Sequence, residues 1–495
     1  METRRWTLWI WLAAGFLAYL FCNGVWGVSV TAWIFPACFL FVSRDFGPVK
    51  GLLLLAAAIF VGAFIHWPGF FAMGSPIEQA FAGIMSLELL APYIVDRIFF
   101  PMFVRDGSVM RRFAGTLIFP MAYATMEVLL CIFRLGNTSC YSLTQIDFLP
   151  FIQITSVFGQ AGMAFLLAWF ASMAYFVIDY IRNRTEKDGS IRKPVSIFVA
   201  VFILVFAYGG IRLATCQPEG PTAKIALAHG PHVENIGGEW EGIEYDTNVE
   251  HADKAIDKAA EGGAEMVVFN EEALDIDYDM MPEITKFLQA KAAETDMYIV
   301  MGFDIEDPAE KKLSRNSIIC FSPEGEVLYD YSKTKLIPLM EVGSYEPGDG
   351  KVNQIEMDLG GAKPKVSSVI CYEGSFTDYM SKLDSDVDIH LNPCWEWKGL
   401  GMAQSAPVII RAVERGYTVL KPTYEAWDTV TDFCGRTIAE DNPDIEGYDS
   451  VLFADVPTEG CNTIYNSIGC IADWIYAAGL VLFALLALAR RRQLK

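Results

Sequence analysis

Long and short apolar stretches divide this chain of 495 residues into two kinds of sequence. Up to Leu213, stretches recur that can cross a hydrocarbon core of about 30 Å at about 1.5 Å per helical residue. Beyond Leu213 the apolar runs have the length of β-strands, until one more long stretch follows. The predicted transmembrane helices cover residues 6–22, 25–41, 51–65, 80–100, 113–133, 148–181, 195–213 and 471–489.

This pattern predicts three domains. Residues 1–215 form a transmembrane domain of about seven helices, residues 216–470 a polar domain, and residues 471–495 a last helix with a basic tail. Lys and Arg residues fall in every second loop, and the loops between them carry only Arg134. Because basic residues in short loops stay in the cytoplasm, we expect both termini there and residues 216–470 on the outer side.

Charge is unevenly distributed between the parts. The chain has a net charge of −22, and residues 216–470 hold 48 Asp and Glu against 19 Lys and Arg. An acidic domain of this kind is not a nucleic-acid-binding domain. A solvated acidic surface explains the charge fully, so the charge predicts no substrate.

Within the polar domain, strand-like runs alternate with helical ones, which predicts an α/β fold. The strand-like runs are 224–228, 266–269, 298–303, 317–321, 366–370, 389–391 and 418–420, and the clearest helical stretches are 250–262 and 284–295. Pro323-Glu324-Gly325 lies between two strand-like runs and predicts a hairpin turn.

Three reactive residues follow strand-like runs or the hairpin: Glu271, Lys333 and Cys371. Ligands and catalytic groups usually lie at the carboxyl edge of an α/β sheet. A single cysteine after a strand is more often a buried core residue. A thiol that attacks an ester or amide, however, needs a base and a cation or donors for the oxyanion, and this set supplies all three.

The phrases around these residues resemble the carbon–nitrogen hydrolase (nitrilase) superfamily. They are Phe269-Asn-Glu271, Asn316-Ser-Ile-Ile-Cys-Phe-Ser-Pro-Glu-Gly325, Lys333-x-x-Leu-Ile-Pro338, Ile370-Cys-Tyr-Glu373 and Arg411-Ala-Val-Glu414. The resemblance covers roughly residues 224–457. It implies an αββα sandwich, here inserted between transmembrane helices.

The resemblance also implies a role for each residue. Cys371 is the expected nucleophile, Glu271 the general base, and Lys333 the oxyanion stabiliser together with the backbone N–H of Tyr372. Glu341 and Glu373 are expected as supporting residues, although a surface carboxylate explains Glu341 nearly as well. Two alternatives remain open by sequence: Lys335 for the lysine and Glu272 for the base.

The flanking helices further resemble those of the bacterial apolipoprotein N-acyltransferases. That family moves an acyl chain from a phospholipid to the α-amino group of the diacylglyceryl-cysteine at a lipoprotein's N-terminus. The resemblance implies a multi-pass protein of the bacterial inner membrane, with its catalytic domain on the periplasmic face. It implies no cofactor, and the five scattered histidines show no metal-ligand spacing.

Some phrases depart from that family's pattern. This chain has Phe269-Asn-Glu271 where that family usually has Trp-Pro-Glu, and Leu339-Met-Glu341 where it has Phe-Gly-Glu. Asn392-Pro-Cys-Trp395 only loosely matches the family's Asn-Asp-x-Trp. These changes leave three alternatives open: an acyltransferase acting on another amine, a membrane-tethered amidase, and a non-catalytic envelope binding protein.

The cysteine positions predict little about disulfide bonds. A pair between Cys461 and Cys470 is conceivable in an oxidising compartment, and Cys320 is expected to be a core thiol.

Overall fold

A computed structural model describes residues 2–22, 27–66, 76–104, 108–133, 140–183, 189–231, 235–236, 239–240, 245–306, 313–338, 340–397, 405–469 and 471–493. Three residues named above, Arg134, Leu339 and Cys470, lie outside these described residues. The chain forms two compact units, one of Met1–Thr215 with Ser467–Lys495 and one of Cys216–Asn466.

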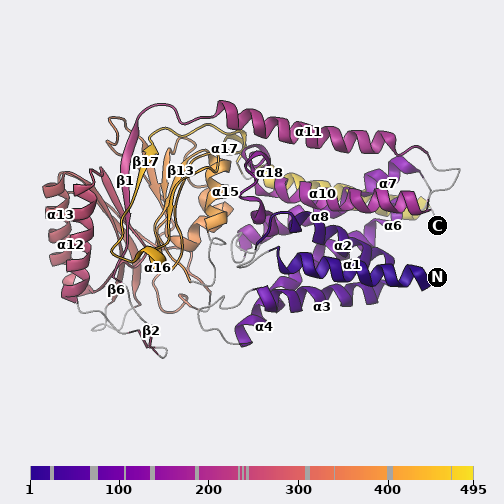
Figure 1. Cartoon of the computed structure of the whole chain (residues 1–495), viewed down its shortest axis with the longest axis horizontal. Coiled ribbons are helices and arrows are strands. Elements are labelled where there is room, and N and C mark those ends of the chain that lie inside the picture. The colour runs from indigo at the N-terminus through magenta and orange to yellow at the C-terminus, as the bar shows by residue number, and fades with distance from the viewer. Residues whose placement is uncertain are drawn as a thin grey trace. The chain divides into compact units, whose positions relative to one another are not determined.

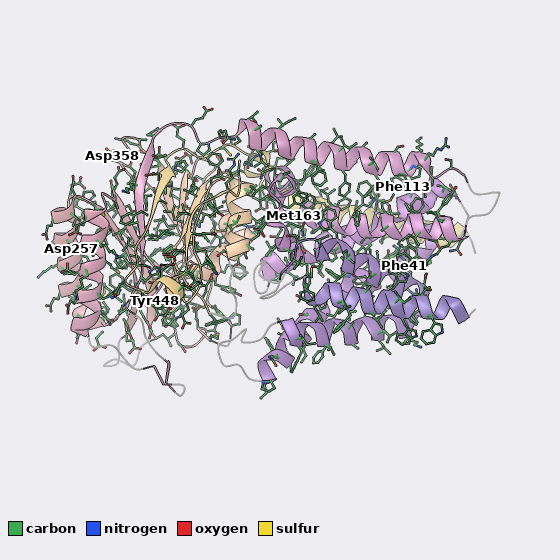
Figure 2. The ribbon with its side chains drawn as sticks, viewed as in Figure 1. Phe41, Phe113, Met163, Asp257, Asp358 and Tyr448 are labelled. Carbon is green, nitrogen blue, oxygen red and sulfur yellow. The ribbon has the colours of Figure 1, made fainter. Side chains whose placement is uncertain are left out.

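The first unit is helical (Figure 1). Its α-helices are α1 (Glu2–Leu20), α2 (Thr31–Asp45), α3 (Pro48–His66), α4 (Pro76–Met85), α5 (Leu90–Phe99), α6 (Pro101–Val104), α7 (Val109–Gly115), α8 (Ile118–Phe133), α9 (Leu149–Ile152), α10 (Thr155–Asn183), α11 (Arg192–Thr215) and α18 (Ile471–Gln493), with 3-10 turns η2 (Ser86–Leu89) and η3 (Tyr141–Gln145). Aromatic and sulfur-containing side chains fill its interior, where Phe41 and Met163 are almost fully buried (Figure 2).

Five helices in the described part of the chain are long and apolar enough to cross a membrane. They are Pro48–Ile65, Val109–Phe133, Thr155–Asn183, Arg192–Thr215 and Ile471–Ala489. Two of the other predicted spans correspond to shorter helices: the apolar part of α1 is Trp6–Leu20, and α2 is Thr31–Asp45. Residues 25 and 26 of the second predicted span lie outside the described residues.

The span predicted over residues 80–100 is helical through residue 99 but is not a single α-helix. The chain forms α4, the 3-10 turn η2 and α5 instead. Pro92 lies in the first turn of α5 and has no backbone N–H, so it cannot bond to the carbonyl of Glu88 four residues earlier. The helix predicted over residues 148–181 is also interrupted, between α9 and α10 and at Gly159, where φ is 67° and ψ is 178°.

The second unit contains two mixed sheets. The first has the order β17-β1-β4-β6-β7-β8, with β5 also paired to β6, and the second has the order β16-β15-β13-β11-β10-β9. The strands of the first sheet are β1 (Thr222–Ala228), β4 (Met266–Phe269), β5 (Leu274–Asp277), β6 (Tyr298–Glu306), β7 (Arg315–Phe321), β8 (Val327–Ser332) and β17 (Leu452–Pro457).

Shorter elements complete this unit. The second sheet consists of β9 (Asn353–Glu356), β10 (Lys365–Ser368), β11 (Ile389–Leu391), β13 (Thr418–Lys421), β15 (Asp428–Thr431) and β16 (Thr437–Asp441). Two small ladders pair β2 (Asn235–Ile236) with β3 (Glu239–Trp240), and β12 (Cys394–Trp395) with β14 (Thr423–Tyr424). The helices are α12 (Tyr245–Glu261), η4 (Tyr278–Met280), α13 (Met281–Thr295), η5 (Cys371–Ser375), α14 (Thr377–Met380), α15 (Ser405–Arg415), α16 (Pro443–Glu446) and α17 (Ile464–Ile468).

Alternating side chains of the strands build three cores. Ile225 and Leu227 of β1 face the core between the two sheets, whereas Ala226 faces a core that α12 and α13 cover. The outer face of the second sheet packs against η5, α14 and α15 in a third core. Figure 1 shows α12 and α13 on one side of the sheets and α15 on the other. The predicted αββα sandwich is therefore confirmed.

Candidate active site

Cys371 stands at a sharp turn after β10. It begins the short helix η5 with a φ of 47°, and its backbone N–H donates to the carbonyl of Pro393 at 2.8 Å. Left-handed backbone costs a residue with a Cβ about 1–2 kcal/mol, and such strain gathers at functional sites. The turn places the thiol beside β12, where Sγ lies 3.7 Å from the carbonyl oxygen of Trp395.

Glu271 follows β4 and is almost fully buried. Its Oε1 accepts hydrogen bonds from Lys333 Nζ at 2.6 Å and Asn316 Nδ2 at 2.7 Å. Its Oε2 accepts one from the backbone N–H of Trp395 at 2.7 Å. Three donors on one side chain suit an ionised carboxylate, which only accepts hydrogen bonds.

Lys333 lies directly after β8 with its side chain 1% exposed. Its Nζ contacts Glu271 Oε1 at 2.6 Å and Glu341 Oε1 at 2.5 Å. Burial alone would lower the pKa of Lys333, but the charges of Glu271 and Glu341 outweigh it and hold this pKa well above its ordinary value. The site therefore contains a fixed ammonium ion.

Glu341 supports Lys333 from the loop after β8. Its Oε2 accepts a hydrogen bond from the backbone N–H of Ile337 at 2.7 Å, which orients the carboxylate toward the ammonium. Burial raises the pKa of Glu341, and the neighbouring Lys333 opposes that shift. The structure thus places Glu341 in the site rather than on the surface.

The Cys371 thiol is held in its neutral form. The Cys394 thiol, burial and the negative charge of Glu271 together raise the pKa of Cys371 well above its ordinary value, and Lys333 only partly opposes them. A neutral thiol is a weak nucleophile. The sulfur therefore needs a base at the moment of reaction.

Glu373 ties two segments of the site together. Its Oε2 accepts hydrogen bonds from the backbone N–H of Ile370 at 2.9 Å and the hydroxyl of Tyr331 at 2.5 Å. Its Oε1 accepts from the N–H groups of Thr334 and Lys335 at 2.7 and 3.0 Å. The carboxylate thus links the turn at Cys371 to the strand end at Lys333.

The structure also separates the alternatives left open by sequence. Lys335 lies away from Glu271, with its ammonium 3.2 Å from Asp378 and a side chain 30% exposed. Asn316 Nδ2 also donates a hydrogen bond to Glu272 Oε1 at 2.8 Å. Burial and the negative charges of Asp304 and Glu271 raise the pKa of Glu272 well above its ordinary value. Lys333 and Glu271 are therefore the pair in contact. Tyr372 follows Cys371 in η5, and its ring packs edge-on against Phe376.

Comparison with known proteins finds one similar family and several similar relatives. The sequence model of the carbon–nitrogen hydrolase family matches residues 231–455. An apolipoprotein N-acyltransferase of Geobacter metallireducens is 24% identical over 70% of this chain and 69% of its own length. The apolipoprotein N-acyltransferase 2 of Treponema denticola is 25% identical over 66% of this chain and 67% of its own length. Residues 231–455 are thus similar to the carbon–nitrogen hydrolase family, and a larger part of the chain is similar to apolipoprotein N-acyltransferases.

The solved structures that are similar to this chain include an amidase from Nesterenkonia sp., with a TM-score of 0.40 and 18% sequence identity. The match covers 49% of this chain and 92% of the amidase.

Several residues of this candidate site were not predicted. Asn316 is a polar residue inside the apolar strand β7, and that position was the one signal available in the sequence. Cys394 and Trp395 lie in the phrase Asn392-Pro-Cys-Trp395, but the sequence did not indicate that they contact Cys371 and Glu271, because these contacts depend on where β12 lies. The buried ion pair between Lys421 and Glu396 was likewise not predicted.

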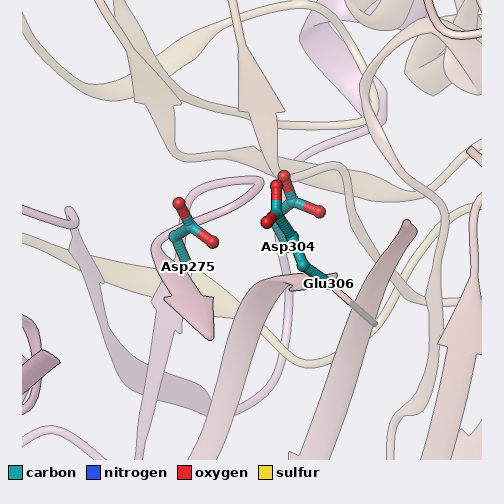
Figure 3. A group of neighbouring side chains, drawn as sticks. All are labelled: Asp275, Asp304 and Glu306. Carbon is teal, nitrogen blue, oxygen red and sulfur yellow. The ribbon is translucent and has the colours of Figure 1, made fainter. Parts of the chain in front are cut away.

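Three carboxylates form a separate group near the candidate site. Asp275 of β5 and Asp304 and Glu306 of β6 have ligand atoms within 4.8 Å of one another (Figure 3). Burial raises the pKa of Asp304 to about 7, while Tyr345 donates its hydroxyl hydrogen to Oδ2 at 2.9 Å. Asp275 and Glu306 are exposed, and exposed acidic groups commonly gather without an ion. We assign no metal to them.

Among the described cysteines of this unit, Cys320, Cys371 and Cys394 are buried free thiols. Cys320 is fully buried between the sheets, which confirms that it is a core thiol. The conceivable partner of Cys461, Cys470, lies outside the described residues.

Proposed function

We propose that this protein is a membrane N-acyltransferase that moves an acyl chain from a phospholipid to the α-amino group of the N-terminal diacylglyceryl-cysteine of lipoproteins. The observation that carries the proposal is the buried contact between Lys333 and Glu271 at 2.6 Å, beside the Cys371 thiol. The named relatives supply the reaction class, since both are apolipoprotein N-acyltransferases.

In the first half-reaction, Glu271 takes the proton of the Cys371 thiol while the sulfur attacks the ester carbonyl of the phospholipid. The carbon–sulfur bond forms, and the ester carbon–oxygen bond breaks. The lysophospholipid leaves as an alcohol with the proton that Glu271 returns. Lys333 and the backbone N–H of Tyr372 stabilise the negative charge on the carbonyl oxygen during the attack.

In the second half-reaction, the neutral amine of the acceptor attacks the thioester. Glu271 accepts the amine's proton, the carbon–sulfur bond breaks, and Cys371 recovers its thiol hydrogen from Glu271. The product is an amide, and the enzyme returns to its starting form. Such a sequence gives ping-pong kinetics.

Transfer rather than hydrolysis requires that water be kept from the thioester. Burial of Cys371, Glu271 and Lys333 supports this requirement, since each is at most 5% exposed. The amidase alternative has the same triad but lets water take the acyl group, and the acceptor dependence of deacylation distinguishes the two.

The experiment is intact-mass analysis of the full-length protein in detergent after incubation with phospholipid. We expect wild type to gain the mass of one acyl chain and Cys371→Ala to gain none. Cys461→Ser is a matched control, because it removes a half-buried thiol elsewhere in the same unit and should acylate like wild type.

A diacylglyceryl-cysteine peptide is then added. Discharge of the acyl group onto the peptide supports the acyltransferase, whereas equal decay with and without peptide identifies a hydrolase. Absence of any adduct on wild type refutes the phospholipid donor.

We further propose that the protein spans the bacterial inner membrane with residues 216–470 on the periplasmic face. The alternation of basic loops supports this orientation, because Lys and Arg in short loops remain on the cytoplasmic side. The five long apolar helices support a multi-pass protein.

A further inference from the structure

A second buried ion pair lies next to the candidate site. Lys421 Nζ and Glu396 Oε1 are 2.7 Å apart, and their side chains are 1% and 2% exposed. Lys421 also donates to the Thr423 hydroxyl at 3.0 Å. Burial alone would lower the pKa of Lys421, but the charge of Glu396 outweighs it and raises this pKa. Burial also raises the pKa of Glu396, and the charge of Lys421 opposes that shift.

The pair lies beside a ladder of two short strands, one of which contacts the candidate site through Trp395. Strands β12 and β14 run parallel, with Cys394 opposite Thr423 and Trp395 opposite Tyr424. Backbone hydrogen bonds extend the ladder at both ends, from Cys394 to Pro422 at 2.9 Å and from Glu396 to Tyr424 at 3.0 Å. Because Glu396 directly follows β12 and Lys421 is the last residue of β13, two residues before β14, their contact connects the end of β12 to the segment that leads into β14.

Trp395, the residue before Glu396, contacts both reacting groups through its backbone. Its N–H donates to Glu271 Oε2 at 2.7 Å, and its carbonyl oxygen lies 3.7 Å from Cys371 Sγ. A shift of β12 would therefore move the donor that orients Glu271. A displacement of about 1 Å in a catalytic group can cost about 10²-fold in rate.

Stability alone is a weak explanation for this pair. Desolvation of two charges largely offsets their attraction, so a buried ion pair adds little net stability over apolar residues of similar size. Removing one partner is different, because it leaves an unpaired charge in the interior. A buried ion pair that adds little net stability can still fix the position of the backbone segments that carry its two residues.

We propose that the Lys421–Glu396 pair is a positioning device that holds the Trp395 amide on Glu271 and so sets the orientation of the base toward Cys371. The inference rests on the proposed role of Glu271. Lys421 and Glu396 act through Trp395 and touch no reacting atom in this scheme.

The test is the rate at which iodoacetamide alkylates Cys371, followed by peptide mass over a range of pH. The main variant is Lys421→Met with Glu396→Leu, which replaces both charges by apolar groups of similar volume. We expect alkylation at pH 7 to slow at least about tenfold and the pH dependence to move to higher pH, because the ionised carboxylate has lost a fixed donor. The melting temperature should stay near that of wild type.

Lys291→Met is the matched control. Lys291 is buried against α12, where it bonds to Asp257 at 2.5 Å, and Asp257 is labelled in Figure 2. This variant also removes a buried lysine from an ion pair, so it should lower the melting temperature and leave alkylation of Cys371 unchanged. Glu396→Gln keeps the shape of the Glu396 side chain and replaces the double variant in this test if the double variant fails to fold. We expect it to slow alkylation of Cys371 less than the double variant does.

Alkylation at the wild-type rate and pH dependence in a folded double variant overturns the proposal. The same samples report on the lipid reaction separately. If wild type alkylates at Cys371 but takes no acyl group from phospholipid, the proposed function fails while the positioning role is still decided by alkylation. If wild type is acylated and the double variant alkylates normally, only the positioning role fails.

Discussion

At the scale of single residues, the candidate site depends on two backbone conformations that residues with side chains rarely adopt. Cys371 has a φ of 47° and Glu272 a φ of 54°, and both follow buried strand sequence. Each costs about 1–2 kcal/mol relative to ordinary backbone. The surrounding hydrogen bonds must hold these turns, so residues that make several such bonds should be sensitive to substitution.

Glu373 is the clearest case. Glu373→Ala removes the acceptor of four donors, two of them buried and two partly buried, and each buried donor left unsatisfied costs about 1–3 kcal/mol. We expect the free energy of unfolding to fall by at least about 3 kcal/mol, measured as a lower melting temperature in detergent, together with loss of acyl transfer.

Glu373→Gln is the control for this prediction. It retains one carbonyl oxygen and should lose less stability than Glu373→Ala. Equal melting temperatures for wild type and Glu373→Ala would show that the carboxylate does not hold the turn.

His229 gives a pH-dependent prediction. Its Nε2 lies 2.7 Å from Asp428 Oδ2 with both side chains fully buried. Burial alone would lower the pKa of His229, but Asp428 outweighs it and raises this pKa above its ordinary value. A raised folded-state pKa adds stability that is complete below the unfolded value of about 6.5 and is lost as pH rises through the folded value.

The melting temperature should therefore fall as pH increases above about 6.5 in wild type. His229→Gln should be less stable at pH 6 and should lose this part of the pH dependence. A wild-type profile that His229→Gln leaves unchanged would contradict the assignment.

At the scale of elements, strand-length apolar runs in the sequence predicted the central strands correctly. The run predicted over residues 266–269 is β4, and the predicted hairpin is formed by antiparallel β7 and β8 with Gly325 at a φ of 76°. The edge strand β9 was not predicted, because its side chains are only partly buried and show no clear alternation. Edge strands depend on pairing with a neighbour more than on their own sequence.

Two adjacent glycines of α11 test how closely helices pack. A Cβ at Gly209 would lie 1.8 Å from the carbonyl oxygen of Pro150, whereas a Cβ at Gly210 meets nothing within 4 Å. Gly209→Ala should therefore push α11 away from α9 and lower the melting temperature markedly. Gly210→Ala, its matched control, should be neutral or slightly stabilising, because alanine favours helix by about 0.5–1 kcal/mol. Similar melting temperatures for the two variants would exclude this close approach.

At the scale of the whole molecule, the separation of helical and α/β units follows from the two kinds of apolar stretch. The helical unit comprises Met1–Thr215 and Ser467–Lys495, and the α/β unit comprises Cys216–Asn466. A bilayer requires long apolar helices because it offers no hydrogen-bonding partner to the backbone. A domain in water needs only strand-length runs to fill its core.

The proposed orientation can be tested with single cysteines. Asp386 is exposed in the α/β unit, and Ser190 is exposed in the loop before α11. In intact bacterial cells, a membrane-impermeant maleimide should label Asp386→Cys and leave Ser190→Cys unlabelled until the cells are opened. Wild type is the control for the native thiols. Labelling of Ser190→Cys alone in intact cells would reverse the orientation.

The sequence by itself determined the partition into membrane and α/β parts, the central strands, and the chemical types of the site, because periodicity and composition are local properties. The tertiary structure decided which of Lys333 and Lys335, and of Glu271 and Glu272, form the contacting pair. It also decided that Asn316 and the Trp395 amide hold Glu271 and that Lys421 meets Glu396. These contacts join segments of two sheets and a short ladder, and their distances depend on how the layers pack rather than on spacing along the chain.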